Sequence, residues 1–112
     1  MTILIISVLG PFFKNDHREC QYYDFEITNK CLNGNNIEVK IENVGNSKIN
    51  FKSDNENSRT YELMSEKSSV MEFRARDKSK VSIIPFFEDL KGKKFECEGK
   101  AEKVDVGRLI KC

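Results

Sequence analysis

The sequence predicts an all-β protein, an antiparallel β-sandwich of about seven strands. Apolar residues recur at every second position through most of the chain after residue 20, and the alternating runs follow one another at intervals of about ten residues. No stretch has the spacing of an amphipathic helix. Because a single sheet of this size would leave one apolar face in water, two packed sheets are expected.

The strands are predicted from local alternation and from the turns between them. Residues 23–27 and 37–41 each place apolar side chains on one face and polar or charged side chains on the other, as half-buried antiparallel strands do. Further strands are predicted at residues 49–51, 61–63, 71–73, 81–87 and 95–106. The side chains expected to face inward are Phe25, Ile27, Ile37, Val39, Ile41, Phe51, Val81, Ile83, Val104 and Val106.

Two local signals refine this pattern. Asn43 and Gly45 suit a turn that needs positive φ and a side chain bonded to its own backbone, so one strand should end there and the next should begin near Lys48. Pro85 lies inside the most apolar strand and has no N–H to donate, so it should sit at a bulge or face an edge.

Length and charge exclude several classes of protein. A chain of 112 residues can bury one core of ordinary size, which predicts one domain, placed at residues 20–112. Charged residues make up 33% of the sequence, yet 19 Lys and Arg against 18 Asp and Glu leave a net charge of only +1. Since such a chain has no global field to attract polyanions, we expect no nucleic-acid partner.

The four cysteines, Cys20, Cys31, Cys97 and Cys112, are an even number in a short chain, which favours two disulfides in an oxidising compartment over reduced thiols. Three pairings are possible. A zinc site would need two close ligand pairs, whereas here the nearest cysteines are separated by ten and by fourteen residues, and the sequence has one histidine. We therefore expect no metal and no other cofactor.

Residues 1–13, MTILIISVLGPFF, form an apolar N-terminal segment. A membrane span needs about 20 apolar residues and a secretory leader usually opens with a basic stretch, whereas the first positive side chain here is Lys14. The β-branched residues would also suit a strand. Three interpretations stay open: a membrane anchor or leader remnant, a strand within the fold, and a strand given to another subunit. The first and the last imply export.

Residues 37–49, IEVKIENVGNSKI, resemble the strand–turn–strand core of immunoglobulin-like surface domains of the bacterial and archaeal adhesion type. The resemblance extends to archaeal pilin-like and archaellin-like surface proteins, in which a hydrophobic segment precedes an immunoglobulin-like β-sandwich with a cysteine just before that strand. Residues 1–13 match the end of the anchor, and Cys31 matches the cysteine. Residues 81–97, VSIIPFFEDLKGKKFEC, match the paired late strands with their own cysteine at Cys97.

This resemblance implies a non-enzymatic, cell-surface structural or adhesive protein, either membrane-anchored through residues 1–13 or forming filaments. Its partner would be protein, either copies of itself or a surface partner. The alternative is a secreted, monomeric binding module that acts on a partner protein. Within the resemblance, Cys31 and Cys97 lie on facing strands, so we expect them to pair and to leave Cys20 for Cys112.

Candidates for chemistry are few, and we expect no enzyme. His17 lies within DHREC, but adjacent residues of an extended chain point to opposite faces and do not converge. The loop at residues 54–57, DNEN, offers oxygen ligands for calcium but lacks the glycine and terminal carboxylate of an EF-hand loop. Lys91, Lys93 and Lys94 form a small basic turn, without the interleaved aromatics of a nucleic-acid site.

Overall fold

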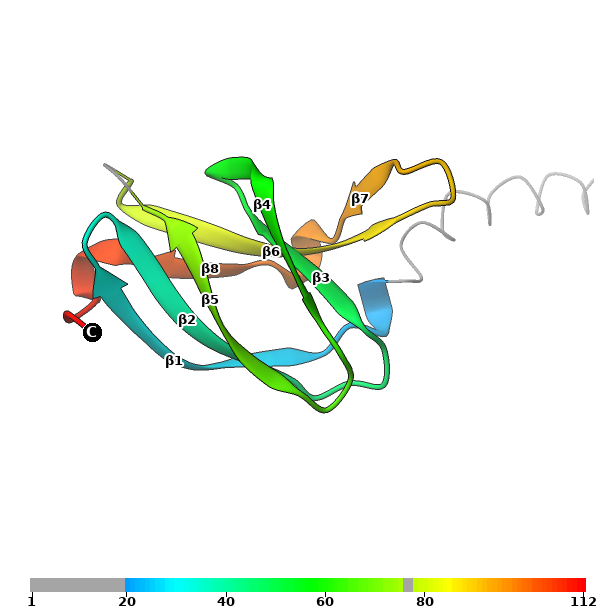
Figure 1. The fold of residues 1–112 in the computed structure, drawn as a ribbon, viewed down its shortest axis with the longest axis horizontal. Coiled ribbons are helices and arrows are strands. Elements are labelled where there is room, and N and C mark those ends of the chain that lie inside the picture. Colours follow the sequence, from blue (N-terminus) through cyan, green and yellow to red (C-terminus); the bar gives the residue numbers. More distant parts are fainter. Residues whose placement is uncertain (1–19, 76–77) are drawn as a thin grey trace, which may run out of the picture.

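The computed structural model of the chain describes residues 20–75 and 78–112 and shows two antiparallel sheets packed together (Figure 1). The predicted all-β sandwich is confirmed. One sheet has the strand order β1-β2-β5, and the other has the order β4-β3-β6-β7, with β8 also paired to β6. The strands are β1 (Phe25–Asn33), β2 (Asn36–Asn43), β3 (Ile49–Ser53), β4 (Glu56–Leu63), β5 (Ser68–Arg74), β6 (Lys80–Glu88), β7 (Lys94–Glu96) and β8 (Glu102–Asp105).

The connections make this an immunoglobulin-like sandwich. The pairs β1–β2, β3–β4 and β6–β7 are hairpins within one sheet, whereas the chain changes sheets between β2 and β3, between β4 and β5, and between β5 and β6. The turn predicted after Asn43 therefore carries the chain from one sheet to the other. A hairpin there would have kept both strands in the same sheet.

The last predicted strand, residues 95–106, is divided in two, which accounts for eight strands where about seven were expected. Strand β7 pairs with the end of β6 and β8 pairs with its beginning, and the short 3-10 helix η1 (Glu98–Lys100) lies between them. A second 3-10 turn, η2 (Val106–Arg108), follows β8.

Pro85 lies at this interruption. It is in the interior strand β6, opposite Phe51 of β3 and away from any bulge, and its hydrogen-bonding groups face the break between β7 and β8, as an edge-facing position requires. Its carbonyl accepts a hydrogen bond from the Cys97 N–H at 2.8 Å. In an antiparallel strand the N–H and the C=O of one residue point to the same neighbouring strand. The carbonyl of Pro85 points to Cys97, so the N–H that proline lacks would also point there, where the neighbouring strand is interrupted between β7 and β8.

The core lies between the sheets. Most of the predicted inward-facing residues are buried: Ile37, Val39, Ile41, Phe51, Val81, Ile83 and Val104. Phe25 and Ile27, on the edge strand β1, and Val106, in η2 rather than in a strand, are only partly buried and pack against this core. An edge strand is covered less completely because it has a neighbour on one side only. Core residues beyond the predicted set include Tyr23, Ile49, Leu63, Met71 and Phe73.

Asn43 is a fully buried polar residue at the change of sheet. Its Nδ2 donates to the Ser47 carbonyl at 2.8 Å and to the Leu63 carbonyl at 3.0 Å, while its Oδ1 accepts from the Gly45 N–H at 3.0 Å. The amide side chain thus bonds its own turn, as predicted, and also joins that turn to the end of β4. Every bond it makes satisfies a backbone group that packing would otherwise leave unpaired.

The predicted positive φ at Asn43 and Gly45 is wrong. Among the described residues, positive φ occurs at Gly34, Glu66 and Gly92. Glycine suits position 45 for a different reason, because a Cβ there would lie 3.2 Å from the Tyr22 carbonyl oxygen. A side chain would require the backbone of the segment before β1 to shift by a few tenths of an ångström.

Candidate functional site

The cysteines form two disulfides, as predicted, but the expected pairing is wrong. Cys20 is bonded to Cys97 and Cys31 to Cys112. Cys31 lies opposite Glu38, whose sequence neighbours on β2 point into the core, so Cys31 faces away from it. Cys97 belongs to the core between the two sheets, whereas Cys31 lies on the outer face of the sheet β1-β2-β5, so the two sulfurs are on opposite sides of that sheet.

Backbone hydrogen bonds between Leu32 and the last residues of the chain bring Cys112 close to Cys31. The Leu32 N–H donates to the Ile110 carbonyl at 2.7 Å, and the Cys112 N–H donates to the Leu32 carbonyl at 2.9 Å. Residues 109–112 thereby lie along the outer side of β1. This pairing covers part of an edge that would otherwise be bare, and it brings Cys112 to Cys31.

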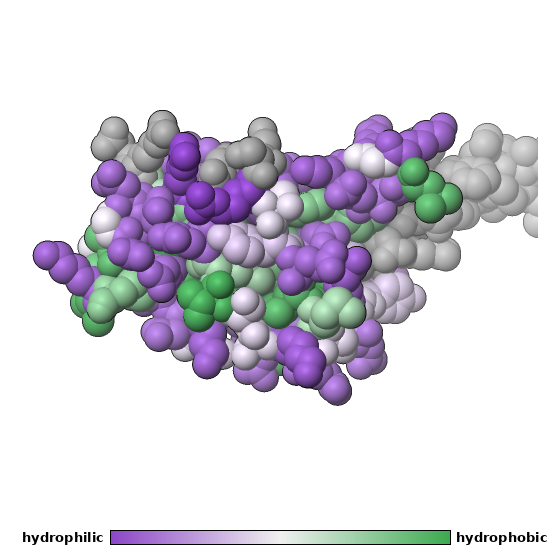
Figure 2. Space-filling model, in the orientation of Figure 1, coloured by the Kyte–Doolittle hydropathy of each residue, from purple (hydrophilic) through white to green (hydrophobic). Residues whose placement is uncertain are grey.

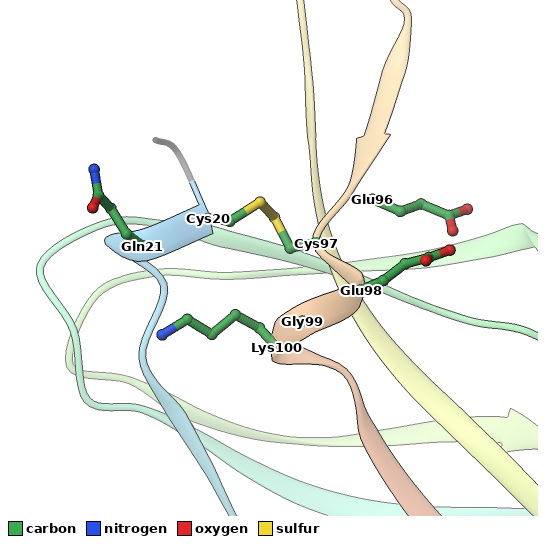
Figure 3. Close-up of a pocket in the computed structure, with 7 residues that line it drawn as sticks. All are labelled: Cys20, Gln21, Glu96, Cys97, Glu98, Gly99 and Lys100. Carbon is green, nitrogen blue, oxygen red and sulfur yellow. A yellow bond between two sulfur atoms is a disulfide. The ribbon is translucent and has the colours of Figure 1, made fainter. Parts of the chain in front are cut away.

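The Cys20–Cys97 disulfide borders a surface depression of about 420 Å³ (Figure 3). A second depression of about 250 Å³ adjoins it and shares Gly99 and Lys100. We call the two together the η1 groove. Its lining residues are Cys20, Gln21, Tyr23, Asp24, Phe25, Glu96, Cys97, Glu98, Gly99, Lys100, Ala101 and Glu102.

The η1 groove exists because the edge strand is broken beside Pro85. The Lys100 N–H donates to the Cys97 carbonyl at 3.0 Å and the Ala101 N–H to the Glu98 carbonyl at 3.1 Å, which closes the 3-10 turn. The disulfide then fastens the segment before β1 to this turn. Figure 3 shows Glu96 and Glu98 extending to one side of the disulfide and Gln21 and Lys100 to the other.

Part of the charge in the η1 groove is already paired. Lys52, buried on β3, forms an ion pair and hydrogen bond with the half-buried Glu96 of β7. Glu98 and Lys100 are exposed. The groove is therefore lined by carboxylates, an amine, an amide, the Tyr23 phenol and a disulfide. Such groups can hold polar ligands through hydrogen bonds and ion pairs.

A group of three possible metal ligands occurs on the outer side of the β1–β2 hairpin. One ligand atom each from Cys31, Glu38 and Cys112 lie within 4.8 Å of one another. Both sulfurs are joined in a disulfide, however, and metal binding to cysteine requires a thiolate. The group is therefore no metal site while the disulfide is formed.

The loop at residues 54–57, whose oxygen atoms were considered as calcium ligands, makes hydrogen bonds to neighbouring segments. The Asp54 Oδ1 accepts from the Ser82 N–H at 3.0 Å, and the Asn55 Nδ2 donates to the Arg74 carbonyl at 2.8 Å. Side chains 56–58, His17 and residues 1–13 lie outside the part of the molecule that can be described.

The basic turn at the end of β6 is backed by aromatic rings, which the sequence interpretation did not anticipate. Phe87 and Phe95 stack across the hairpin with ring centroids 5.1 Å apart. The Lys93 ammonium lies 5.2 Å from the Phe95 ring centroid, and the Lys94 ammonium lies 5.4 Å from that of Phe86. Lys93 and Phe95 are two residues apart on one side of the hairpin, whereas Phe86 and Phe87 lie on the opposing strand β6, so the pairing of β6 with β7 completes the cluster.

Comparisons of the chain with protein-family models, with curated proteins and with solved structures found no match. The described residues, 20–75 and 78–112, include no helix long and apolar enough to cross a membrane. Fold and disulfides together define the class, a disulfide-bonded, all-β sandwich of immunoglobulin-like architecture. The resemblance to archaeal surface proteins stays a prediction.

Proposed function

We propose that this chain is an exported, non-enzymatic surface protein whose sandwich is held at a membrane by residues 1–13 and is presented to a protein partner. The observation that carries the proposal is the pair of disulfides. One bonds Cys20 to Cys97, between β7 and β8, and the other bonds Cys112 to Cys31 of β1, with sequence separations of 77 and 81 residues. Disulfides of this kind form and persist in oxidising, extracytoplasmic compartments.

A separate role for residues 1–13 is supported by the completeness of the core. Within the described residues the two sheets already enclose a continuous set of buried side chains, from Tyr23 to Val104. Residues 3–10 contain one polar side chain, Ser7. Exposure of such an apolar segment to water is unfavourable, and burial in lipid would remove it from water.

A non-enzymatic role is supported by the chemistry of the η1 groove. The groove contains two sulfurs bound in a disulfide, and its polar side chains are carboxylates, an amine, an amide and the phenol of the buried Tyr23. Presentation of a stable, charged surface fits these features better than a reaction.

A membrane-insertion series tests the proposal. Ile5→Lys puts a charge in the apolar segment, and Asn15→Lys adds the same charge outside it. A buried charge costs about 2.5–3.5 kcal/mol on insertion scales, so Ile5→Lys should move the exported protein from the membrane fraction to the soluble fraction, while Asn15→Lys should not. Both proteins should carry oxidised cysteines and be cleaved by protease added to intact cells.

Two results would overturn the proposal. One is a full-length protein that stays soluble without detergent. The other is a full-length protein that external protease cannot reach. The first result, with both disulfides formed, would favour the alternative, a secreted binding module. That alternative has its own support, because large apolar side chains are exposed at one end of the sandwich.

A further inference from the structure

Four loops gather at one end of the sandwich, which we call the N-terminal end because it includes residues 21–24. Within each sheet the registers align the strand ends that these loops join: Phe25 lies opposite Asn43, Ile49 opposite Leu63, and Glu88 opposite Lys94. Figure 1 shows the two sheets packed so that these connections lie toward the same end of the sandwich, with the tip of the β6–β7 hairpin standing apart from the loop between β4 and β5. The loops are residues 21–24, 44–48, 64–67 and 89–93.

Each of these loops exposes one large apolar or aromatic side chain. The four residues, Tyr22, Val44, Met64 and Leu90, have between 41% and 106% of their surface exposed. The other exposed large hydrophobic residues among the described ones are Val70, on strand β5, and Ile110, near the opposite end. Figure 2 shows a hydrophobic side chain standing among hydrophilic ones at the tip of the β6–β7 hairpin.

Hydrogen bonds to backbone groups fix the conformation of these loops. The Val44 N–H donates to the Asp24 carbonyl at 3.0 Å, and the Ser65 hydroxyl donates to the Gly45 carbonyl at 2.6 Å. In the hairpin, the Asp89 carboxylate accepts the N–H groups of Lys91 and Lys93 at 2.9 and 2.8 Å, which closes the turn around Leu90. The exposed apolar surface is therefore a property of an ordered end.

Charge alone does not select the partner of this end. Lys91, Lys93 and Lys94 follow Leu90, but Glu88 and Asp89 lie in the same hairpin. The neighbouring loops add Asp24, Lys48, Glu66 and Lys67. The charges of the two signs nearly cancel. A contact made by this end must therefore depend mainly on its apolar side chains.

We propose that the N-terminal end rests on a lipid bilayer, with Tyr22 and Leu90 inserted at the level of the headgroups and with Lys91 and Lys93 directed to lipid phosphates. Tyrosine and lysine are residues that favour this interface. Separate convex loops fit a fluid surface that needs no fixed complementary shape, whereas a protein partner would need a matching set of cavities.

The inference rests on the proposed function in one respect. Cys20 lies seven positions after residue 13, and an extended chain of seven residues reaches at most about 25 Å. If residues 1–13 are held in the membrane, the disulfide at Cys20 keeps the N-terminal end within that distance of the bilayer.

Single-tryptophan variants can test this contact, because the sequence contains no tryptophan. The test positions are Leu90→Trp and Tyr22→Trp, and the matched controls are Val70→Trp and Ile110→Trp, which are also exposed. The full chain, with a histidine tag at residue 1, is held on phosphatidylcholine vesicles that contain a nickel-chelating lipid and acyl chains brominated near the headgroup. Bromine quenches only indoles that enter the bilayer.

We expect the emission of Leu90→Trp and Tyr22→Trp to be quenched at least threefold more than that of Val70→Trp and Ile110→Trp, equally at low and at high salt. Quenching no greater at the test positions than at the controls would overturn the inference and leave a protein as the partner of this end. Loss of the difference at high salt would also overturn it, since the contact would then be electrostatic. An untagged chain that fails to bind vesicles, while the tethered chain shows the difference, would overturn the proposed anchor alone.

Discussion

The phenol oxygen of Tyr61 makes two hydrogen bonds to the backbone of Glu72. It donates to the Glu72 carbonyl at 2.7 Å and accepts from the Glu72 N–H at 3.0 Å. Tyr61 lies on β4 and Glu72 on β5, and these strands belong to different sheets, so one side chain joins the two. Because β5 is an edge strand, the same bonds occupy backbone groups that would otherwise be free to pair with another chain.

Tyr61→Phe should lower the free energy of unfolding by about 1–2 kcal/mol, because it removes both hydrogen bonds while keeping the ring that packs edge-on against Phe73. Urea denaturation measures the change. The control is Tyr22→Phe, at an exposed position, which should stay within about 0.5 kcal/mol of the wild type. Equal effects of the two substitutions would show that the Tyr61 hydroxyl contributes nothing to stability.

Asn43→Ala should lower the free energy of unfolding by about 2–4 kcal/mol, since it leaves the carbonyls of Ser47 and Leu63 and the N–H of Gly45 without their partner. Chemical denaturation again supplies the measurement. Asn46→Ala, on the exposed side of the same turn, is the matched control and should have little effect. A small loss at Asn43 would mean that water replaces the buried amide.

Val39→Asp should abolish cooperative unfolding, because it places an unpaired carboxylate at a fully buried position in a domain whose stability is about 5–15 kcal/mol. Lys40→Ser, on the outer face of the same strand, should leave the melting temperature nearly unchanged. The reverse result, a folded Val39→Asp and an unfolded Lys40→Ser, would invert the register of β2.

Removal of either disulfide should be strongly destabilising. The two disulfides close loops with sequence separations of 77 and 81 residues. The entropy that each removes from the unfolded chain should stabilise the folded protein by about 4–5 kcal/mol. The double variants Cys20→Ser/Cys97→Ser and Cys31→Ser/Cys112→Ser should therefore lose similar amounts, as measured by denaturation under non-reducing conditions. A loss of less than about 1 kcal/mol in either would show that reduced chains keep their ends together.

The two disulfides should differ in reactivity. Cys112 is exposed, whereas Cys97 is buried in the core, so a limiting amount of reductant should open Cys31–Cys112 first. Peptide mapping after partial reduction and alkylation identifies the opened pair. Preferential labelling of Cys20 and Cys97 would contradict the observed burial.

The strands could be predicted because alternation is a local property. Residues 37–41 and 81–83 show in the sequence which side chains point inward, and the structure buries those side chains. The pairing of cysteines could not be predicted in this way. It depends on a bulge between Ile27 and Asn29, which changes the register of β1, and on the backbone pairing of Leu32 with the end of the chain.

The candidate sites were less predictable than the strands. The break between β7 and β8 makes the η1 groove, and the sequence shows only Pro85, on the neighbouring strand, as an indication of it. The apolar N-terminal end combines single residues from four loops, each of which is unremarkable on its own. Exposed Leu90 and exposed Tyr22 are separated by 67 intervening positions in the sequence and belong to different sheets, so the packing of the two sheets places them at one end.

The sequence by itself determined the fold class and the formation of two disulfides, because hydrophobic alternation and cysteine number act through short-range geometry and composition. Only the tertiary structure decided which cysteines meet, which strand is divided and which loops share an end. These features depend on contacts between residues far apart in the chain, such as Cys31 with Cys112 and Tyr61 with Glu72. Sheet register and packing select those contacts after the strands have formed, so no local pattern records them.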